Sequence, residues 1–252
     1  MKLNYKKYGE GQPMIIVHGL FGTLDNWQTI GKKIAEDYEV YLIDQRNHGH
    51  SPKSKEMNYE LMADDLHEFI TDLELSDVIL VGHSMGGKTV MTYATKHPEY
   101  IDKMIVVDIA PKKYPMHHQQ ILAGLNSLDL SKINKRREAD EQLEKYIDNI
   151  GIRQFLLKNL YWIEKGKLGW RINIPVLTQE MEQILSEVPM VKVETPTLFI
   201  RGEKSNYITE DDYQDIYNQF SNSEIETIYG VGHWIHAENP LEFYNLLMGF
   251  CS

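Results

Sequence analysis

Ser84 lies in a short motif whose residue types and spacing could perform nucleophilic chemistry. The motif is Gly82-x-Ser84-x-Gly86, with an apolar run before it at residues 78–81 and a helix-compatible run after it at residues 88–94. The two glycines leave room for neighbouring backbone to pass close to a strained turn. A strand–turn–helix context lifts such a serine to a helix N-terminus, whose dipole favours developing negative charge. We therefore predict that Ser84 is a nucleophile; the alternative is a serine in an ordinary tight turn.

His233 is the candidate for the base that this serine needs. A serine hydroxyl is a poor nucleophile until a base takes its proton. His233 follows the last expected strand, and Gly230 and Gly232 place it on a flexible turn. This position suits a triad whose chain order is serine, acid and then histidine. His236 is the nearest rival, but it lies at the entry to the last expected helix, where we expect it to be a packing or capping residue.

Two backbone N–H groups could stabilise the negative charge that develops on the substrate oxygen. We expect Met85, directly after the nucleophile, to supply one of them. The other should come from the turn after the first parallel strand, from Leu20, with Phe21 as the neighbouring alternative. His18 and His83 are expected to brace loop backbone.

The catalytic acid has two candidate locations. Asp108 stands after an apolar run, although a buried aspartate there could simply tie down the following loop. The other location follows the expected strand at residues 197–201. Ser205 is found there, and a hydroxyl cannot carry the charge that stabilises an imidazolium. Asp211 and Asp212 lie shortly downstream, in a stretch that is typical of a helix N-terminus.

The elements that must position these residues alternate along the chain. Short apolar strands are expected at residues 14–18, 40–44, 78–82, 104–109, 197–201 and 225–229, and helices at 27–37, 62–73, 85–96, 210–220 and 241–250. Strands that are apolar on both faces predict a mostly parallel, doubly wound α/β sheet with helices on each side. Right-handed crossovers connect such strands, and ligands bind beyond their carboxyl ends. Ser84 falls at that edge.

Residues 112–189 break the alternation. They contain no convincing strand, but polar helical segments at 134–150 and 153–160 are followed by a loop-like stretch at 164–169. An insertion of this length beside the serine would cover the site as a lid.

The predicted organisation is thus a core domain of residues 1–111 and 190–252 with a helical lid of residues 112–189. The aromatic residues of the lid could form its own small core, and some of them should face the substrate. We select Phe21, Trp162 and Trp234 as candidate substrate-binding residues.

Composition excludes some classes of partner. The chain has 252 residues and a formal net charge of −11, which disfavours nucleic acids and anionic membranes as partners. Its single cysteine, Cys251, cannot form an internal disulfide, and no segment has the length and hydropathy of a signal peptide or a membrane span. These features favour a cytoplasmic protein that acts on a small molecule.

Several motifs together resemble the α/β-hydrolase superfamily, and more narrowly the bacterial YbfF-type esterases. They are His18-Gly19-Leu20-Phe21-Gly22, Asp44-x-Arg46-Asn47-His48-Gly49-x-Ser51, Gly82-His83-Ser84-Met85-Gly86-Gly87-Lys88, Asp108-Ile109-Ala110-Pro111 and Gly232-His233-Trp234-x-His236-Ala237-Glu238. The resemblance spans nearly the whole chain and is weakest in the lid. It implies a serine hydrolase of carboxylic esters or acyl-CoA-type thioesters, an acyl-enzyme intermediate, and neither a cofactor nor a metal. It also favours Asp108 as the acid.

Two other functions fit the same residues. One is a related enzyme on this fold: a carbon–carbon bond hydrolase, a lyase or a cofactor-free haloperoxidase. The other is a non-catalytic binding protein, because a fold alone does not determine function. The serine–histidine pair argues against the second. Epoxide hydrolases and dehalogenases are disfavoured because they place an aspartate where Ser84 stands.

Overall fold

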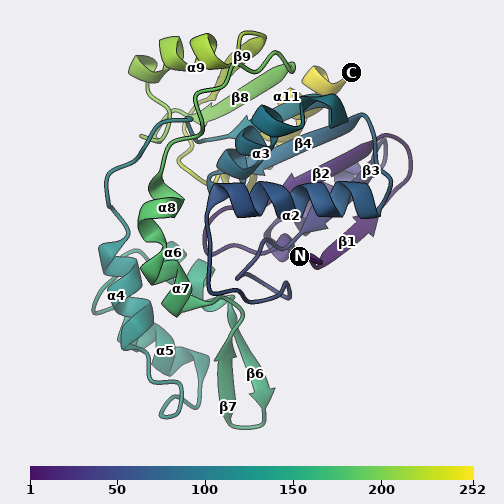
Figure 1. Ribbon diagram of the computed structural model, residues 1–252. Helices are drawn as coiled ribbons and strands as arrows, with labels where there is room; N and C mark the ends of the chain where they lie inside the picture. The colour runs from purple at the N-terminus through teal and green to yellow at the C-terminus, as the bar shows by residue number, and fades with distance from the viewer.

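A seven-stranded sheet forms the centre of the protein in the computed structural model, which describes residues 1–252 (Figure 1). The strand order is β1-β3-β2-β4-β5-β8-β9. The bounds are β1 (Tyr5–Tyr8), β2 (Pro13–Val17), β3 (Glu39–Ile43), β4 (Val78–His83), β5 (Ile101–Val107), β8 (Thr197–Gly202) and β9 (Ser223–Ile228). All neighbouring pairs are parallel except β1 with β3. The predicted sheet of mostly parallel strands is confirmed.

Helices cover both faces of this sheet. The longer ones are α1 (Gln28–Ile34), α2 (Tyr59–Asp72), α3 (Met85–Lys96), α9 (Tyr213–Gln219) and α11 (Pro240–Cys251), and the shorter ones are α10 (Ile235–Glu238) and the 3₁₀ turns Leu24–Trp27, Pro98–Tyr100 and Glu210–Asp212. Successive side chains of a strand point to opposite faces. In β2, Ile15 and Val17 therefore join a buried cluster with α2 and α3, while Met14 and Ile16 join a second one with α1 and α11.

The elements of the lid lie together beyond the sheet (Figure 1). They are α4 (Gln119–Ser127), α5 (Arg136–Leu143), α6 (Ile150–Leu157), β6 (Leu160–Glu164), β7 (Lys167–Trp170), α7 (Ile174–Gln179) and α8 (Met181–Leu185). The expected helix at residues 134–150 is shorter than predicted, because α5 ends at Leu143. No helix in the structure combines the length and the apolar character needed to cross a membrane.

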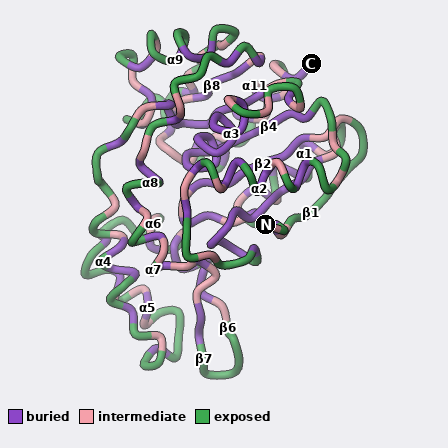
Figure 2. Tube along the Cα trace, viewed as in Figure 1, coloured by how far each residue is buried: buried purple, intermediate pink, exposed green.

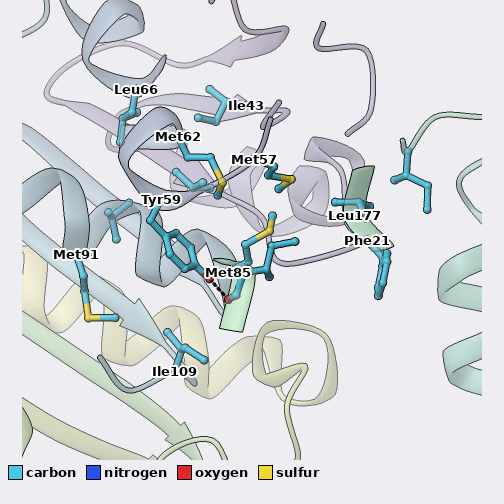
Figure 3. Packing of buried hydrophobic residues seen from close by; sticks show 14 of the residues in the cluster. Phe21, Ile43, Met57, Tyr59, Met62, Leu66, Met85, Met91, Ile109 and Leu177 are labelled. Atoms are coloured by element: carbon cyan, nitrogen blue, oxygen red, sulfur yellow. Dashed lines mark hydrogen bonds between the residues drawn. The ribbon is translucent and has the colours of Figure 1, made fainter. Parts of the chain in front are cut away.

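The lid and the sheet share one hydrophobic cluster. Leu177 of the lid belongs to the same cluster of 49 buried residues as Met62 and Met91 of the core helices. Figure 3 shows Phe21 and Met85 within this packing, and Figure 2 shows buried segments continuing from the sheet into the lid. The hydrophobic effect that stabilises the core therefore also holds the lid in place.

Two pieces of β structure were not predicted from the sequence. The expectation that the lid contains no strand is wrong, because β6 and β7 form an antiparallel hairpin. Its turn is short, and Gly166 adopts the positive φ of 82° that hairpin turns favour. The other missed strand is β1, whose Lys6 and Lys7 give it no apolar alternation. Charged residues of this kind are common on edge strands, where they discourage unwanted pairing.

Two buried histidines brace the loops that follow β2 and β3. His18 Nε2 accepts a hydrogen bond from the Gln45 N–H at 3.1 Å, and His48 Nε2 accepts one from the Phe21 N–H at 3.2 Å. A ring nitrogen that accepts a hydrogen bond cannot carry a proton, so both rings are neutral. Burial lowers the pKa of His18 to about 4 and that of His48 to about 3.

We predict that the free energy of unfolding decreases as the pH falls from 6.5 to about 4. In that window the unfolded histidines bind protons that the folded ones cannot, which costs about 1.4 kcal/mol per pH unit for each group. Urea unfolding at a series of pH values measures this slope. His18→Gln should make the slope shallower, and His50→Gln, which changes an exposed histidine, is the matched control. An unchanged slope in His18→Gln would contradict the assignment.

Candidate active site

Ser84 occupies a strained turn between β4 and α3. Its φ of 53° and ψ of −119° are unusual for a residue with a side chain. Neighbouring backbone passes so close that a Cβ on Gly82 would lie 2.4 Å from the Gly86 oxygen. A Cβ on Gly86 would lie 2.2 Å from the Val17 oxygen. Only glycine fits at both positions, so the motif spacing follows directly from the packing of this turn.

Asp108 and His233 are joined by a hydrogen bond. His233 Nδ1 donates to Asp108 Oδ2 at 2.7 Å, and the aspartate side chain is fully buried. The same carboxylate accepts hydrogen bonds from the Gly202 N–H at 3.2 Å and from the Ser205 hydroxyl. Hydrogen bonds to an ionised group are stronger than neutral ones, so these donors stabilise the buried charge and fix its orientation. The arrangement holds the His233 ring in one tautomer.

Asp211 and Asp212 make no hydrogen bond to His233. Asp211 is exposed, whereas Asp212 forms an ion pair with Lys112 at 2.6 Å and accepts a hydrogen bond from the Thr209 N–H at 2.8 Å. Asp212 is therefore a capping residue, as its sequence context suggested.

Ser205 is a residue whose contribution the sequence reasoning missed. It was set aside because a hydroxyl cannot carry charge, yet its hydroxyl donates to Asp108. The signal was available in its position, since residues after β8 lie beside the end of β5 in the sheet.

Ring stacking and a hydrogen bond to the backbone fix the segment that carries His233 and His236. The Tyr207 ring stacks on the His233 ring with a centroid separation of 4.1 Å. His83 Nε2 donates to the His233 carbonyl at 2.9 Å, so His83 braces backbone as expected. His236 stacks on Trp27 at 3.9 Å, and burial lowers its pKa to about 3. His236 is thus a packing residue.

Ser84 and His233 line one cavity of about 560 Å³ between the core and the lid. In this structure the two side chains are not hydrogen-bonded to each other, although such contacts commonly tighten only when a substrate binds. Phe21 and Trp234 also line the cavity. Trp162 does not; it lies on β6 with 52% of its surface exposed, so we leave it out of the candidate site.

Other apolar side chains complete the wall of this cavity. They include Ile109, Ile121, Ile152, Phe155, Leu156 and Ile184. Most of them come from the lid. Which lid side chains face the cavity depends on how the lid packs against the core, so the sequence alone did not indicate them.

The backbone N–H groups near Ser84 differ in whether they are free. The Phe21 N–H donates to His48, which removes it as a candidate for binding a substrate oxygen. The Leu20 N–H has no acceptor in the protein. Met85 is the first residue of α3, so its N–H has no acceptor within the helix. Both Leu20 and Met85 line the cavity.

No group of three or more histidine, cysteine, aspartate or glutamate side chains is arranged to hold a metal ion.

Comparisons with known proteins identify the family and the relatives of the chain. A family profile described as the alpha/beta hydrolase fold matches residues 12–240. The chain is 35% identical over 246 residues to the protein named Esterase YbfF of Escherichia coli (strain K12), with 95% of each chain covered. It is 38% identical over 251 residues to the protein named sn-1-specific diacylglycerol lipase ABHD11 of Danio rerio, with 96% of this chain and 79% of that protein covered.

A solved structure named Marine microorganism esterase has a TM-score of 0.96 and 44% identity to this chain, with 99% of both chains covered. The names of these relatives are those of esterases and a lipase, which supports a hydrolase. Because the family profile covers most of the residues and YbfF aligns over nearly the whole length, the chain belongs to the α/β-hydrolase family and is similar to the YbfF-type esterases.

Proposed function

We propose that the protein is a serine hydrolase that cleaves carboxylic esters or thioesters with Ser84, His233 and Asp108. The observation that carries the proposal is the 2.7 Å hydrogen bond from His233 Nδ1 to the buried Asp108 carboxylate. This bond leaves Nε2 of the ring as the free base, in the cavity that Ser84 also lines. The strained turn at Ser84 is a further support, because strain of this kind is concentrated at functional sites.

Acylation begins when His233 Nε2 takes the proton of the Ser84 hydroxyl and the serine oxygen attacks the acyl carbon. Asp108 stabilises the imidazolium that forms, without itself becoming protonated. The negative charge moves to the acyl oxygen, where the N–H groups of Leu20 and Met85 are suited to receive it. The intermediate then expels the alcohol or thiol, which takes the proton from the imidazolium.

Deacylation repeats these steps with water as the nucleophile. His233 takes a proton from the water, the hydroxide attacks the acyl-enzyme, and Ser84 leaves with the proton that the ring returns. The carboxylic acid and the free enzyme are the products. An ester and a thioester present the same acyl carbon, so the proposed residues act identically on both.

The shape of the cavity favours a substrate with an apolar acyl group. Its volume of about 560 Å³ falls in the usual range for small-molecule sites, and apolar side chains from both core and lid surround it. The names of the relatives, which include a diacylglycerol lipase and two esterases, are consistent with an acyl substrate. We therefore propose that the lid side of the cavity holds the acyl chain.

We predict that Ser84→Ala lowers the turnover of an aryl ester by roughly 10³–10⁶-fold, because the triad acts as a unit. The melting temperature should change little, since the substitution removes one hydroxyl that makes no hydrogen bond in the protein. Steady-state hydrolysis of graded-length aryl esters and acyl-CoA thioesters measures the loss. Purified Ser84→Ala protein that retained most of its activity would refute the serine mechanism.

The acid gives a second prediction. Asp108→Asn should lower kcat by about 10²–10⁴-fold, because an amide favours the wrong tautomer of His233. Asp211→Asn is the matched control on an exposed residue, and Asp212→Asn should act on stability rather than on chemistry. The kcat values of both control variants should remain within about tenfold of that of the unmodified enzyme. Capping changes lower the free energy of unfolding by at most ~1–2 kcal/mol and do not act on the chemistry. A crippled Asp211→Asn or Asp212→Asn beside an active Asp108→Asn would move the acid to the later location.

A further inference from the structure

Lys88 is a fully buried lysine that the proposed chemistry does not use. It lies one helical turn after Ser84 on α3, where its own N–H donates to the Ser84 carbonyl at 3.1 Å. The side chain extends to the base of the lid. Its Nζ donates to the Lys112 carbonyl at 2.8 Å, to the Ser186 carbonyl, and to the Leu185 carbonyl at 3.5 Å.

These three carbonyls come from the two segments that connect the lid to the core. Lys112 lies on the outgoing segment after β5, whereas Leu185 and Ser186 lie on the returning segment at the end of α8. Neither the Lys112 carbonyl nor the Ser186 carbonyl accepts another hydrogen bond from the protein. Both carbonyls are partly buried, and a carbonyl that is shielded from water without a partner is costly, so the ammonium group satisfies atoms that would otherwise destabilise the lid base.

The two segments are also paired directly with each other. The Tyr114 N–H donates to the Leu185 carbonyl at 2.8 Å, and the Val188 N–H donates to the Pro111 carbonyl at 2.8 Å. Lys88 thus lies beside the two paired connecting segments. Its side chain links both of them to α3, the helix that follows Ser84. The Tyr59 hydroxyl adds a parallel anchor by donating to the Ile184 carbonyl at 2.5 Å.

The chemistry of an ammonium group matches this environment. A lysine has three donors and no acceptor, and it meets three carbonyl oxygens here. The ring of Tyr114 lies 4.7 Å from Nζ and that of Tyr59 lies 5.7 Å away, which adds cation–π attraction. Burial lowers the pKa of Lys88 to about 7, and the nearby negative charge of Glu187 partly opposes this shift. Burying a cation at this position destabilises the protein unless its contacts compensate for the loss of water.

A role in binding a substrate anion is disfavoured by the same contacts. Lys88 is one of the residues that line the cavity, so a negatively charged group could approach it. Its Nζ already donates to the Lys112 and Ser186 carbonyls of the lid base, however, and an incoming anion would have to displace these contacts. The contacts therefore point to the lid rather than to a ligand.

We propose that Lys88 is a positioning residue that locks the base of the lid to α3, the helix that follows Ser84. This lock holds the lid wall of the acyl cavity in a fixed position beside Ser84. The contacts at the lid base carry the structural part of this proposal. The part that concerns the acyl cavity rests on the proposed function.

Amide hydrogen exchange tests the structural part without any assay of activity. In Lys88→Met, the amides of Tyr114 and Val188, which bridge the two connecting segments, should exchange at least about tenfold faster, because local opening becomes easier. The Leu80 amide in the central strand β4 should not change. Lys96→Met, on the same helix but paired with surface carboxylates, is the matched control and should leave all three amides unchanged. Unchanged exchange at Tyr114 and Val188 in Lys88→Met would overturn the proposal.

Lys88→Gln provides the same test if the methionine variant does not fold, because the amide group of glutamine can still donate hydrogen bonds. Faster exchange at Tyr114 and Val188 than at Leu80 would support the lock, and equal changes at all three would overturn it.

Kinetics test the catalytic consequence. KM for an octanoyl aryl ester should rise by about tenfold more than KM for the acetyl ester in Lys88→Met, because the longer chain depends on the lid wall. Equal changes in the two KM values would contradict this consequence. If Ser84→Ala left activity intact, the proposed function would fail while the exchange result at Tyr114 and Val188 would still decide the lock.

Discussion

The hydrogen bond between His233 and Asp108 joins two loops that are 125 residues apart in the sequence. It can form only because the parallel strands end at one edge of the sheet. Ser84 follows β4 and Asp108 follows the neighbouring strand β5, so these two residues are adjacent by topology. His233 follows β9, which is separated from β5 by β8. Its loop must therefore extend across the end of β8 to reach the carboxylate.

This crossing explains the role of the residues after β8. Ser205 and the Gly202 N–H both donate to Asp108, and Tyr207 stacks on the His233 ring. The segment that could have supplied the acid instead supports the acid that we propose, Asp108, which directly follows β5. Gly202 is needed in this arrangement, because a Cβ there would lie 2.3 Å from the Gly232 oxygen. The backbone of β8 and the turn that carries His233 are thus packed in direct contact.

The sequence predicted those parts of the fold that depend on local pattern. The strands of the sheet from residue 14 onward and the glycine-flanked turn at Ser84 are visible as apolar runs and fixed spacings. The hairpin of the lid and β1 were missed because they are short and carry charged residues such as Lys6 and Lys167. The contacts of Ser205 and Lys88 were missed for another reason. The hydrogen bonds from Ser205 to Asp108 and from Lys88 to Ser186 join residues nearly 100 positions apart, and no local pattern encodes such a pair.

Two features of the candidate site depend on the three-dimensional structure. The choice between Leu20 and Phe21 depends on where each N–H points, and the Phe21 N–H is already bonded to His48. The choice among the lid aromatics depends on packing, and Trp162 lies outside the cavity. Both are questions of side-chain and backbone direction, which residue type and spacing do not specify.

We propose that Ser84 is the activated nucleophile, and covalent labelling tests this proposal most directly. A fluorophosphonate probe loses fluoride when a serine oxygen attacks its phosphorus, so only an activated serine reacts readily. The labelled protein would be digested and its peptides mapped by mass spectrometry. We predict one adduct, on Ser84, with no labelling of Ser84→Ala and slower labelling of Asp108→Asn. An unmodified Ser84 in protein incubated with the probe, or equal labelling of the Ser84→Ala variant, would contradict it.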